Sequence, residues 1–582
     1  MDTYQKTIGS RLMLSGFMMI ALSFILIYRM AGIGVIQHGH YLALAQNQQR
    51  FEETETASRG KILVHDSVSD PNAYYPLAFD VKSFSVWAVP NQIKDKRATA
   101  SALAGPLDIP ENEIFELINN NKLYIPPLKK SLNLSKADSI SSKNITGIFV
   151  MPEYNRYYPE GSLASQLLGF VNSEGTGNYG VEGYYDSELK GKNGDIVGEK
   201  DTLGRMISML SQTNPQNGTS YVLTIDRSVQ YYVEKRLAQA IEETQAESGT
   251  VIVMDVATGG ILTMVNNPTF DPNNYRETAN TNQALFGNPA ISSLYEPGSI
   301  FKPLIVSAAL DSGTVTPETT NTFGTTVEVD GYTIHTAEGK AFGTENVAQI
   351  LQNSDNVGMV WLADQMGNDI MSNYIQKFGF GSKSGIDLTG EESGQVPKVK
   401  NWRNINRATI SFGQGVSVTP LQMVAAYGAI ANNGRYIYPH LISNIVYNDG
   451  TEKEIKREEG NQIISSSTAT ELRAMLANDV LHYRSLGAKV QGFQVGAKTG
   501  TAQIPSPTGG YMTSPDGSNL GIFIHSVCGM APTDDPKFVM IVKLDKPKSA
   551  EFAERTAGPL FGDITSFLLN YYYHVPGKQA SQ

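Results

Sequence analysis

The pattern of apolar and polar positions divides the chain into three regions. Near the N-terminus the run LMLSGFMMIALSFILIY carries no charge, and apolar residues resume after Arg29 as far as Ile36. As a helix with a rise of 1.5 Å per residue, this run spans roughly 26 Å, close to the thickness of the hydrocarbon core of a bilayer. No Ala-x-Ala-like cleavage site follows it, so we predict a transmembrane anchor over residues 12–36 rather than a cleaved signal peptide.

The orientation of the anchor follows from the charges that flank it. Lys6 and Arg11 precede the apolar run. Basic residues next to a membrane span favour the cytoplasmic side. We therefore predict a short cytoplasmic tail over residues 1–11, a single pass through the inner (plasma) membrane, and the bulk of the protein outside the cytoplasm.

Residues 37–217 mix short strand-like runs with polar and glycine-rich joints. A polar stalk, HGHYLALAQNQQRFEETET, leads into SRGKILV, and the later stretch NSEGTGNYGVEGYYDSELKGKNGD is rich in glycine. Such long glycine-rich segments are unusual in a compact enzyme core. We predict a non-catalytic mixed α/β domain here, called the pedestal below, with a solvated face formed by Glu182, Asp186, Glu188 and Lys190.

From residue 218 the elements become longer and more regular. SYVLTID reads as a strand, Asp226 stands at the start of an amphipathic helix of about five turns, and TVIVMDVATGGILTMV reads as two strands joined by a turn. Three later strand-like runs, VGAKTGTAQ, GIFIHSVCGMAP and KFVMIVKLDKP, precede an apolar helix. This order predicts an α+β domain over residues 218–582, with an antiparallel sheet flanked by helices.

Charge and cysteine content exclude several classes of function. The net charge is −11 and no basic run is longer than Lys129-Lys130, which argues against a nucleic-acid partner. Cys528 is the single cysteine, so the chain can form no intrachain disulfide, and its strand-like context favours a buried thiol. The histidines lack the spacing of a metal site, so we expect neither a metal nor a cofactor.

Candidate chemistry begins at YEPGSIFKPL, where Ser299 and Lys302 are three residues apart. On a helix this spacing places both side chains on one face, about 5–6 Å apart at Cβ. The preceding Pro-Gly turn and the following Pro303 place Ser299 at a helix N-terminus. There the helix dipole favours an alkoxide-like oxygen and lowers the lysine pKa, so a neutral Lys302 could take the Ser299 proton.

The spacing of Ser299 and Lys302 is weak evidence alone, because Ser58…Lys61 and Ser187…Lys190 share it. Two later motifs strengthen it: Ser354-Asp355-Asn356 at a predicted helix start, and Lys498-Thr499-Gly500 on a predicted strand. A competing Lys383-Ser384-Gly385 lies in the loop FGFGSKSGIDLTGEESG, which has no flanking β-branched run. A Ser-x-x-Lys, a Ser-x-Asn and a Lys-Thr-Gly in this order are typical of penicillin-interacting serine enzymes.

With these motifs the chain resembles the class B penicillin-binding proteins, the monofunctional peptidoglycan D,D-transpeptidases, and most of all the division-type (septal) enzyme and its sporulation relatives. RYYPEGSLASQLLGFV, GVEGYYDSELKGKNG, TIDRSVQ and SFGQGVSVTPLQMVAAYGAIANNG extend the resemblance over nearly the whole chain. The chain departs from the family after RGKI, where the usual Asp-Arg-Asn-Gly turn is missing, and in having Ser-Asp-Asn for the Ser-Ser-Asn of many division-type members. The resemblance implies a penicillin-binding transpeptidase fold and a pedestal of the dimer type.

The resemblance implies a catalytic role for each residue of the first two motifs. Ser299 would attack the carbonyl between the terminal D-alanines of a stem peptide, with Lys302 as the general base. Ser354 would pass a proton to the departing D-alanine, and Asn356 would hold Lys302 and the peptide backbone. The backbone N–H groups of Ser299 and Thr501 would form the oxyanion hole.

The third motif would bind the substrate. Lys498, Thr499 and Thr501 would hold the terminal carboxylate of the stem peptide, next to Gly500. An amine from a neighbouring strand would then attack the acyl-enzyme and form the cross-link, and β-lactams would acylate the same serine. The implied partners are a multispan glycosyltransferase of the shape, elongation, division and sporulation type and small single-span division regulators.

Other interpretations remain open at this stage. A D,D-carboxypeptidase would carry the same motifs, and a catalytically silent membrane scaffold of the wall-synthesis complex would keep the anchor and pedestal. A class A β-lactamase is disfavoured because no Glu-x-x-Leu-Asn occurs between the second and third motifs. A Ser-His-Asp hydrolase is disfavoured because no histidine lies close to these motifs and no Gly-x-Ser-x-Gly occurs.

Overall fold

The structure is a computed structural model that describes residues 2–42, 50–67, 70–123, 125–200, 206–337, 339–456, 460–482, 493–507, 509–514 and 519–573. The chain divides into two compact units. The first unit comprises Met1–Ser58 and Gly191–Asn217, and the second comprises Arg59–Lys190 and Gly218–Gln582.

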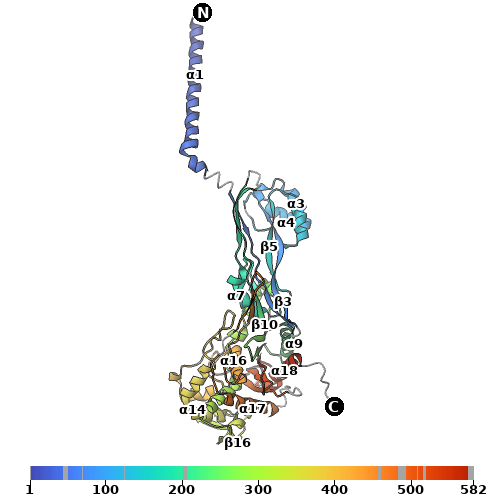
Figure 1. Cartoon of the computed structure of the whole chain (residues 1–582), viewed down its shortest axis with the longest axis vertical. Helices are drawn as coiled ribbons and strands as arrows, with labels where there is room; N and C mark the ends of the chain where they lie inside the picture. Colours follow the sequence, from blue (N-terminus) through green and yellow to red (C-terminus); the bar gives the residue numbers. More distant parts are fainter. Residues whose placement is uncertain are drawn as a thin grey trace. The chain divides into compact units, whose positions relative to one another are not determined.

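The first unit contains the apolar N-terminal segment and a small sheet. Helix α1 (Asp2–Ala31) continues into a π-helical turn, η1 (Gly32–Ile36), and the stretch Arg11–Ile36 is long and apolar enough to cross a membrane (Figure 1). Its apolar side chains are exposed, as expected for a helix whose surroundings are hydrocarbon. The unit also holds an antiparallel sheet in the order β1-β8-β9, with strands β1 (Arg50–Glu55), β8 (Gly194–Lys200) and β9 (Met206–Thr213).

The second unit contains a seven-stranded sheet that draws strands from both sides of the predicted boundary at residue 218. Strand β10 (Ser220–Asp226) pairs in parallel with β2 (Ile62–Ser67) and antiparallel with β17 (Ile442–Val446). The order is β18-β17-β10-β2-β3-β4, with β5 paired to β3, and the further strands are β3 (Asp70–Ala88), β4 (Lys129–Leu132), β5 (Ile148–Tyr157) and β18 (Glu452–Glu454).

Three helices pack together beside the paired strands β3 and β5: α3 (Lys96–Leu107), α4 (Glu111–Ile118) and α5 (Leu134–Ser141) (Figure 1). Helix α3 begins at Asp95, whose side chain accepts a hydrogen bond from the backbone N–H of Ala98. Leu103 and Ile114 from these helices pack with Val86 of β3 in a separate small core.

A buried ion network lies at the stretch GVEGYYDSELKGKNG, one of those on which the family resemblance rests. Glu182, on α7 (Gly180–Tyr184), is fully buried and accepts from Arg59 Nε at 2.7 Å and from Arg156 Nε at 2.6 Å. Arg59 Nη1 also contacts Asp186 Oδ1 at 2.7 Å. The predicted solvated face is therefore wrong for Glu182, because two guanidinium groups from distant segments neutralise it inside the protein.

The predicted strand, helix and hairpin that follow residue 218 are present. Helix α9 (Arg227–Thr244) begins at Asp226, whose carboxylate accepts from the N–H groups of Ser228 and Val229. The hairpin consists of β11 (Ser248–Asp255) and β12 (Ile261–Asn267).

This hairpin belongs to a five-stranded antiparallel sheet in the order β12-β11-β21-β20-β19. Its other strands are β19 (Gly496–Gln503), β20 (Phe523–Ala531) and β21 (Phe538–Asp545). Side chains alternate between its faces: Val251 and Val253 of β11 join a core with α9 and α18 (Ala557–Tyr573), while Ile252 joins the core on the opposite face. The predicted α+β fold, an antiparallel sheet flanked by helices, is confirmed.

The opposite face of the sheet carries the helices that position the site (Figure 1). They are α12 (Lys302–Asp311), α13 (Val347–Gln352), α14 (Asn356–Lys377), α15 (Asn404–Ser411), α16 (Pro420–Ala431) and α17 (Ser466–His482). Two short antiparallel strand pairs also belong to this unit: the hairpin of β14 (Thr326–Val329) and β15 (Tyr332–His335), and the pair of β13 (Thr320–Phe323) and β16 (Gly343–Asn346), which flank that hairpin in the chain.

The remaining short elements of the second unit are α6 (Ser165–Leu168), α8 (Asp186–Lys190), α10 (Tyr275–Thr281), α11 (Pro289–Ser292), β6 (Phe170–Val171), β7 (Gly177–Asn178) and the 3-10 turns η2 (Pro90–Gln92), η3 (Pro272–Asn274), η4 (Gln283–Phe286), η5 (Gly298–Phe301), η6 (Val399–Asn401) and η8 (Ala553–Arg555).

Candidate active site

Ser299 lies in the 3-10 turn η5, which leads directly into α12. The predicted helix N-terminus at Ser299 is therefore a 3-10 turn, and the regular α-helix begins at Lys302. Gly298 has a φ of +58°, a left-handed conformation that glycine adopts without strain, and its N–H donates to the Gly413 carbonyl at 3.1 Å. Pro303 lies in the first turn of α12, as expected. The local sequence thus fixes both the turn and the helix that follows.

Lys302 is the first residue of α12 and is fully buried. Its Nζ donates to three neutral oxygens: the Ser354 carbonyl at 2.6 Å, Ser354 Oγ at 3.1 Å and Asn356 Oδ1 at 2.7 Å. Burial, and then the positive charge of Lys498, hold the pKa of Lys302 well below the usual 10.5. The negative charges of Asp355 and Asp479 oppose this shift without reversing it. This shift favours the neutral amine, which keeps only two protons to donate, so in that form Nζ donates to the Ser354 carbonyl and to Asn356 Oδ1 and accepts from the Ser354 hydroxyl.

Ser354 lies in the turn between α13 and α14 and has a φ of +55°, which is uncommon for a residue with a side chain. Asp355 begins α14 and accepts from the N–H groups of Val357 at 2.9 Å and Gly358 at 3.0 Å. This capped turn presents both the carbonyl and the hydroxyl of Ser354 to Lys302. Such backbone strain is often found at functional sites.

A chain of hydrogen bonds joins the first two motifs. Ser354 Oγ donates to Ser299 Oγ at 3.1 Å, and Lys302 Nζ donates to Ser354 Oγ. The described structure thus links the Lys302 amine to Ser299 through Ser354 rather than directly. Asn356 fixes the other side of the amine, because its Nδ2 donates to the His335 carbonyl at 3.1 Å and so orients its Oδ1 toward Lys302.

Lys498 lies on β19 and is almost fully buried. Its Nζ forms an ion pair with Oδ2 of Asp479 on α17, at 3.3 Å. Burial raises the pKa of Asp479 to about 6, against the lowering effect of Lys498, so the carboxyl is ionised at neutral pH. Asp479 was not predicted from the sequence, although it continues the buried stripe that Leu472 and Leu476 form on α17 with a polar side chain.

Gly500 allows β19 to approach the turn η5, which carries Ser299, closely. A Cβ on Gly500 would lie 2.9 Å from Ser526 Oγ and 3.0 Å from a side-chain carbon of Ile300, too close for ordinary contacts. Because Ile300 directly follows Ser299, a side chain at residue 500 would have to displace the Ser526 hydroxyl or the Ile300 side chain, so glycine fits this position best.

The two threonines of the third motif contact the 3-10 turn η8. Thr499 Oγ1 donates to Oε1 of Glu554 at 2.7 Å, and the Ala553 N–H donates to Thr501 Oγ1 at 3.2 Å. No pattern in the sequence predicted these contacts, because η8 follows β19 by about fifty residues and contains only three.

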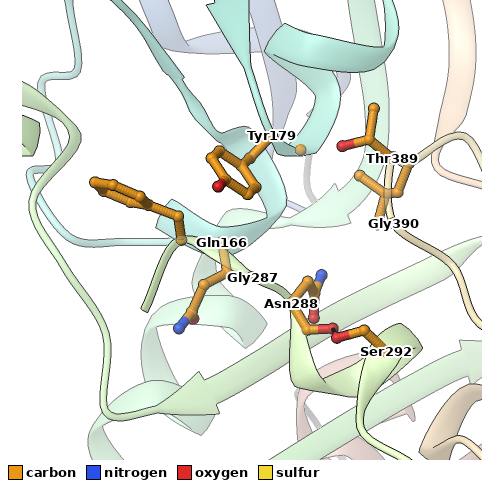
Figure 2. Close-up of a pocket in the computed structure, with 10 residues that line it drawn as sticks. Gln166, Tyr179, Gly287, Asn288, Ser292, Thr389 and Gly390 are labelled. Atoms are coloured by element: carbon orange, nitrogen blue, oxygen red, sulfur yellow. Dashed lines mark hydrogen bonds between the residues drawn. The ribbon is translucent and has the colours of Figure 1, made fainter. Parts of the chain in front are cut away.

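A separate hollow of about 220 Å³ lies elsewhere in the second unit. Figure 2 shows that its labelled residues come from several segments, among them Tyr179, Asn288, Ser292 and Thr389. Ser292 Oγ donates to the Asn288 carbonyl at 2.8 Å. The residues that line this hollow do not include those of the three motifs.

Two family domains match the chain. The penicillin-binding protein dimerisation domain matches residues 54–223, and the penicillin binding protein transpeptidase domain matches residues 249–566. The second match extends over more than half of the chain and contains all three motifs.

Curated relatives match over most of their length. The Escherichia coli K12 protein named peptidoglycan D,D-transpeptidase FtsI is 30% identical over 96% of this chain and 91% of its own. Stage V sporulation protein D of Bacillus subtilis is 32% identical over 87% of this chain and 77% of its own.

Solved structures share the fold. A peptidoglycan synthetase from Bifidobacterium adolescentis has a TM-score of 0.73 at 29% identity, and covers 92% of this chain and 98% of its own. Penicillin binding protein 2X from Streptococcus thermophilus has a TM-score of 0.75 at 26% identity, and the match covers 89% of this chain and 80% of that protein. The resemblance seen in the sequence is confirmed, and the chain belongs to the class B penicillin-binding proteins.

Proposed function

We propose that the chain is a peptidoglycan D,D-transpeptidase that cross-links stem peptides through an acyl-enzyme on Ser299. The observation that carries this proposal is the hydrogen-bonded chain from Lys302 through Ser354 to Ser299, with a lysine whose surroundings favour the neutral amine. A neutral buried amine next to a hydroxyl nucleophile is the arrangement that base-assisted acyl transfer requires.

In the acylation step Ser299 Oγ attacks the carbonyl between the two terminal D-alanines. Its proton passes to the Lys302 amine, directly or through the Ser354 hydroxyl, which already bonds both groups. The same route returns the proton to the amine of the departing D-alanine when the peptide C–N bond breaks. In the second half-reaction an acceptor amine attacks the ester carbonyl, and Ser299 regains its proton.

Strand β19 would bind the donor peptide. It is the outer strand of the five-stranded sheet, so an extended peptide can add along its free edge. Lys498, Thr499 and Thr501 would hold the terminal carboxylate, with Gly500 between them. The N–H groups of Ser299 and Thr501 would stabilise the oxyanion, where one lost donor typically costs about 3–4 kcal/mol. A β-lactam would acylate Ser299 in the same way, through the carbonyl of its ring amide.

The rest of the chain would place this chemistry at the membrane. We assign residues 12–36 to the anchor, with residues 1–11 in the cytoplasm, residues 37–217 to a pedestal, and residues 218–582 to the transpeptidase domain outside the cytoplasm. The relatives named for division and sporulation support a role in septal wall synthesis. The multispan glycosyltransferase and the single-span regulators expected from the sequence would meet the anchor and the pedestal.

Labelling with a fluorescent penicillin tests the nucleophile. We expect the wild-type chain to be labelled and Ser299→Ala to lose the label entirely. Ser292→Ala is the matched control, because it removes a nearby hydroxyl that bonds the Asn288 carbonyl, outside the three motifs. Equal labelling of Ser299→Ala and wild type would contradict the assignment.

A second assay separates transpeptidation from hydrolysis. The purified chain receives a D-Ala-D-Ala peptide with and without an amine acceptor, and the expected result is an amide-linked product that depends on the acceptor. Release of D-alanine without any linked product, even when a glycosyltransferase partner is supplied, would instead identify a carboxypeptidase.

A further inference from the structure

We propose that Glu554 is a specificity-determining residue of this site: its carboxylate occupies the subsite for the donor's terminal carboxylate and must leave it before an anionic donor can bind. The inference rests on the proposed function, since that function assigns the terminal carboxylate to Lys498, Thr499 and Thr501. It adds a residue outside the three motifs that discriminates between donors by the charge of their terminus.

The first argument is the use of the Thr499 hydroxyl. This hydroxyl has one proton, and the structure gives that proton to Oε1 of Glu554 at 2.7 Å. Thr499 therefore cannot donate to a donor carboxylate while Glu554 stays in place. A carboxylate at hydrogen-bonding distance from this hydroxyl is the same chemical group that a stem-peptide terminus would bring.

The second argument is that the neighbouring groups of the subsite are also in use. Lys498 forms its ion pair with Asp479, and Thr501 Oγ1 accepts from the N–H of Ala553, the residue next to Glu554. Two acidic side chains thus already lie at the third motif. They lie close enough that Glu554 contributes, by its negative charge, to the raised pKa of Asp479.

The third argument is which of the two acids can leave. Asp479 is buried within α17, whereas Glu554 is half-buried in a three-residue 3-10 turn and has one more rotatable bond. With Asp479 and Glu554 already present, a donor carboxylate would bring a third negative charge next to the ammonium of Lys498. Like charges at close range repel, so the acid on the short turn would rotate away as the donor enters.

The test compares two acyl donors on the full-length chain in detergent. One donor is benzoyl-D-alanyl thioglycolate, which ends in a carboxylate, and the other is the same thioester ending in a carboxamide. The variants are Glu554→Gln and Glu554→Ala, and the control is Glu551→Gln. Glu551 carries the same charge three residues away, but its side chain accepts from Asn519. The readout is the second-order rate constant of acylation, followed by thiol release.

We expect Glu554→Gln to raise the rate constant for the carboxylate donor about five- to tenfold, through a lower KM, and to change that for the carboxamide donor less than twofold. Glu554→Ala should gain at least as much, and Glu551→Gln should match wild type. An unchanged rate with the carboxylate donor, or an equal loss with both donors in variants that melt like wild type, would overturn the proposal in favour of a positioning role for Glu554. Ser299→Ala runs in parallel: if it still acylates, the proposed function fails, whatever Glu554 does.

Discussion

Lys302 and Lys498 are both buried in the same site, but their partners differ in charge. Lys302 donates only to neutral oxygens, two of Ser354 and one of Asn356. Lys498 instead forms an ion pair with the Asp479 carboxylate. None of these three acceptors of Lys302 is a carboxylate, and burial disfavours its ammonium form, whereas the buried Lys498 lies next to a carboxylate of opposite charge.

The two lysines are also coupled. The charge of Lys498 is one of the causes that lower the pKa of Lys302. Lys498 therefore acts on Lys302 through its charge, because one cation disfavours a second cation nearby. The difference teaches that the carboxylate partner, rather than the lysine itself, decides which amine can act as a base.

The largest effect is expected from exchanging each lysine for arginine. A guanidinium stays protonated at all accessible pH values, so Lys302→Arg cannot accept the Ser299 proton. We expect its acylation rate with fluorescent penicillin to fall by about a thousandfold or more. Lys498→Arg keeps its charge and should lose about tenfold or less. If Lys302→Arg retained a tenth of the wild-type rate, Lys302 would not be the base, and the contrast drawn with Lys498 would be wrong.

A smaller but more specific effect is expected from Asn356→Asp, which gives Lys302 the type of partner that Lys498 has. A carboxylate at about 2.7 Å from Nζ would favour the ammonium form and raise the pKa of Lys302. We expect acylation at pH 7.5 to fall at least about tenfold, which corresponds to a rise of one pKa unit or more.

The pH profile distinguishes this cause from simple damage. The rate of Asn356→Asp should recover as the pH rises, while Asn356→Ala should be slow without moving the acidic limb of the profile upward. If the limb of Asn356→Asp coincides with that of wild type, Lys302 is not the group that titrates.

The smallest effect is expected on stability, from Asp479→Asn. The folded pKa of Asp479 is about 6, above its ordinary 3.8, so the folded state holds the proton more tightly than the unfolded state. Its contribution to the free energy of unfolding is therefore fully present below about pH 4 and is lost as the pH rises through about 6. The shift corresponds to roughly 2–3 kcal/mol.

The measurement is the melting temperature of wild type minus that of Asp479→Asn, taken between pH 4.5 and pH 7.5. We expect this difference to decrease by a few degrees across the range. An increase would mean that the ionised pair with Lys498 stabilises the fold outright, and would reverse the assigned direction of the Asp479 pKa.

The parts of the fold that local pattern controls could be predicted from the sequence. Asp226 caps α9 because a carboxylate before an amphipathic run satisfies the free N–H groups, and this requires only neighbouring residues. The alternating β-branched runs became the strands of the central sheet for the same reason. The turn around Ser299 was predicted from its glycine and prolines, although its 3-10 geometry was not.

The partners that come from distant segments could not be predicted. Glu182 looked like a surface acid, and only the fold brings Arg59 and Arg156 to it. Asp479 and Glu554 lie next to the third motif because α17 and η8 pack against β19, and no local spacing encodes that packing. The catalytic roles assigned to the motif residues stay predictions until the variants above are measured.

The register of the central sheet gives the chain a built-in reporter. Cys528 on β20 lies directly opposite Lys498 on β19, is fully buried, and has a thiol pKa that burial raises well above its usual value. Its side chain packs in the core on the helix-covered face of the sheet, so a thiol reagent can reach it only when that core opens. As the single cysteine of the chain, it would report any opening of this core next to β19 by its rate of alkylation, with no engineered label.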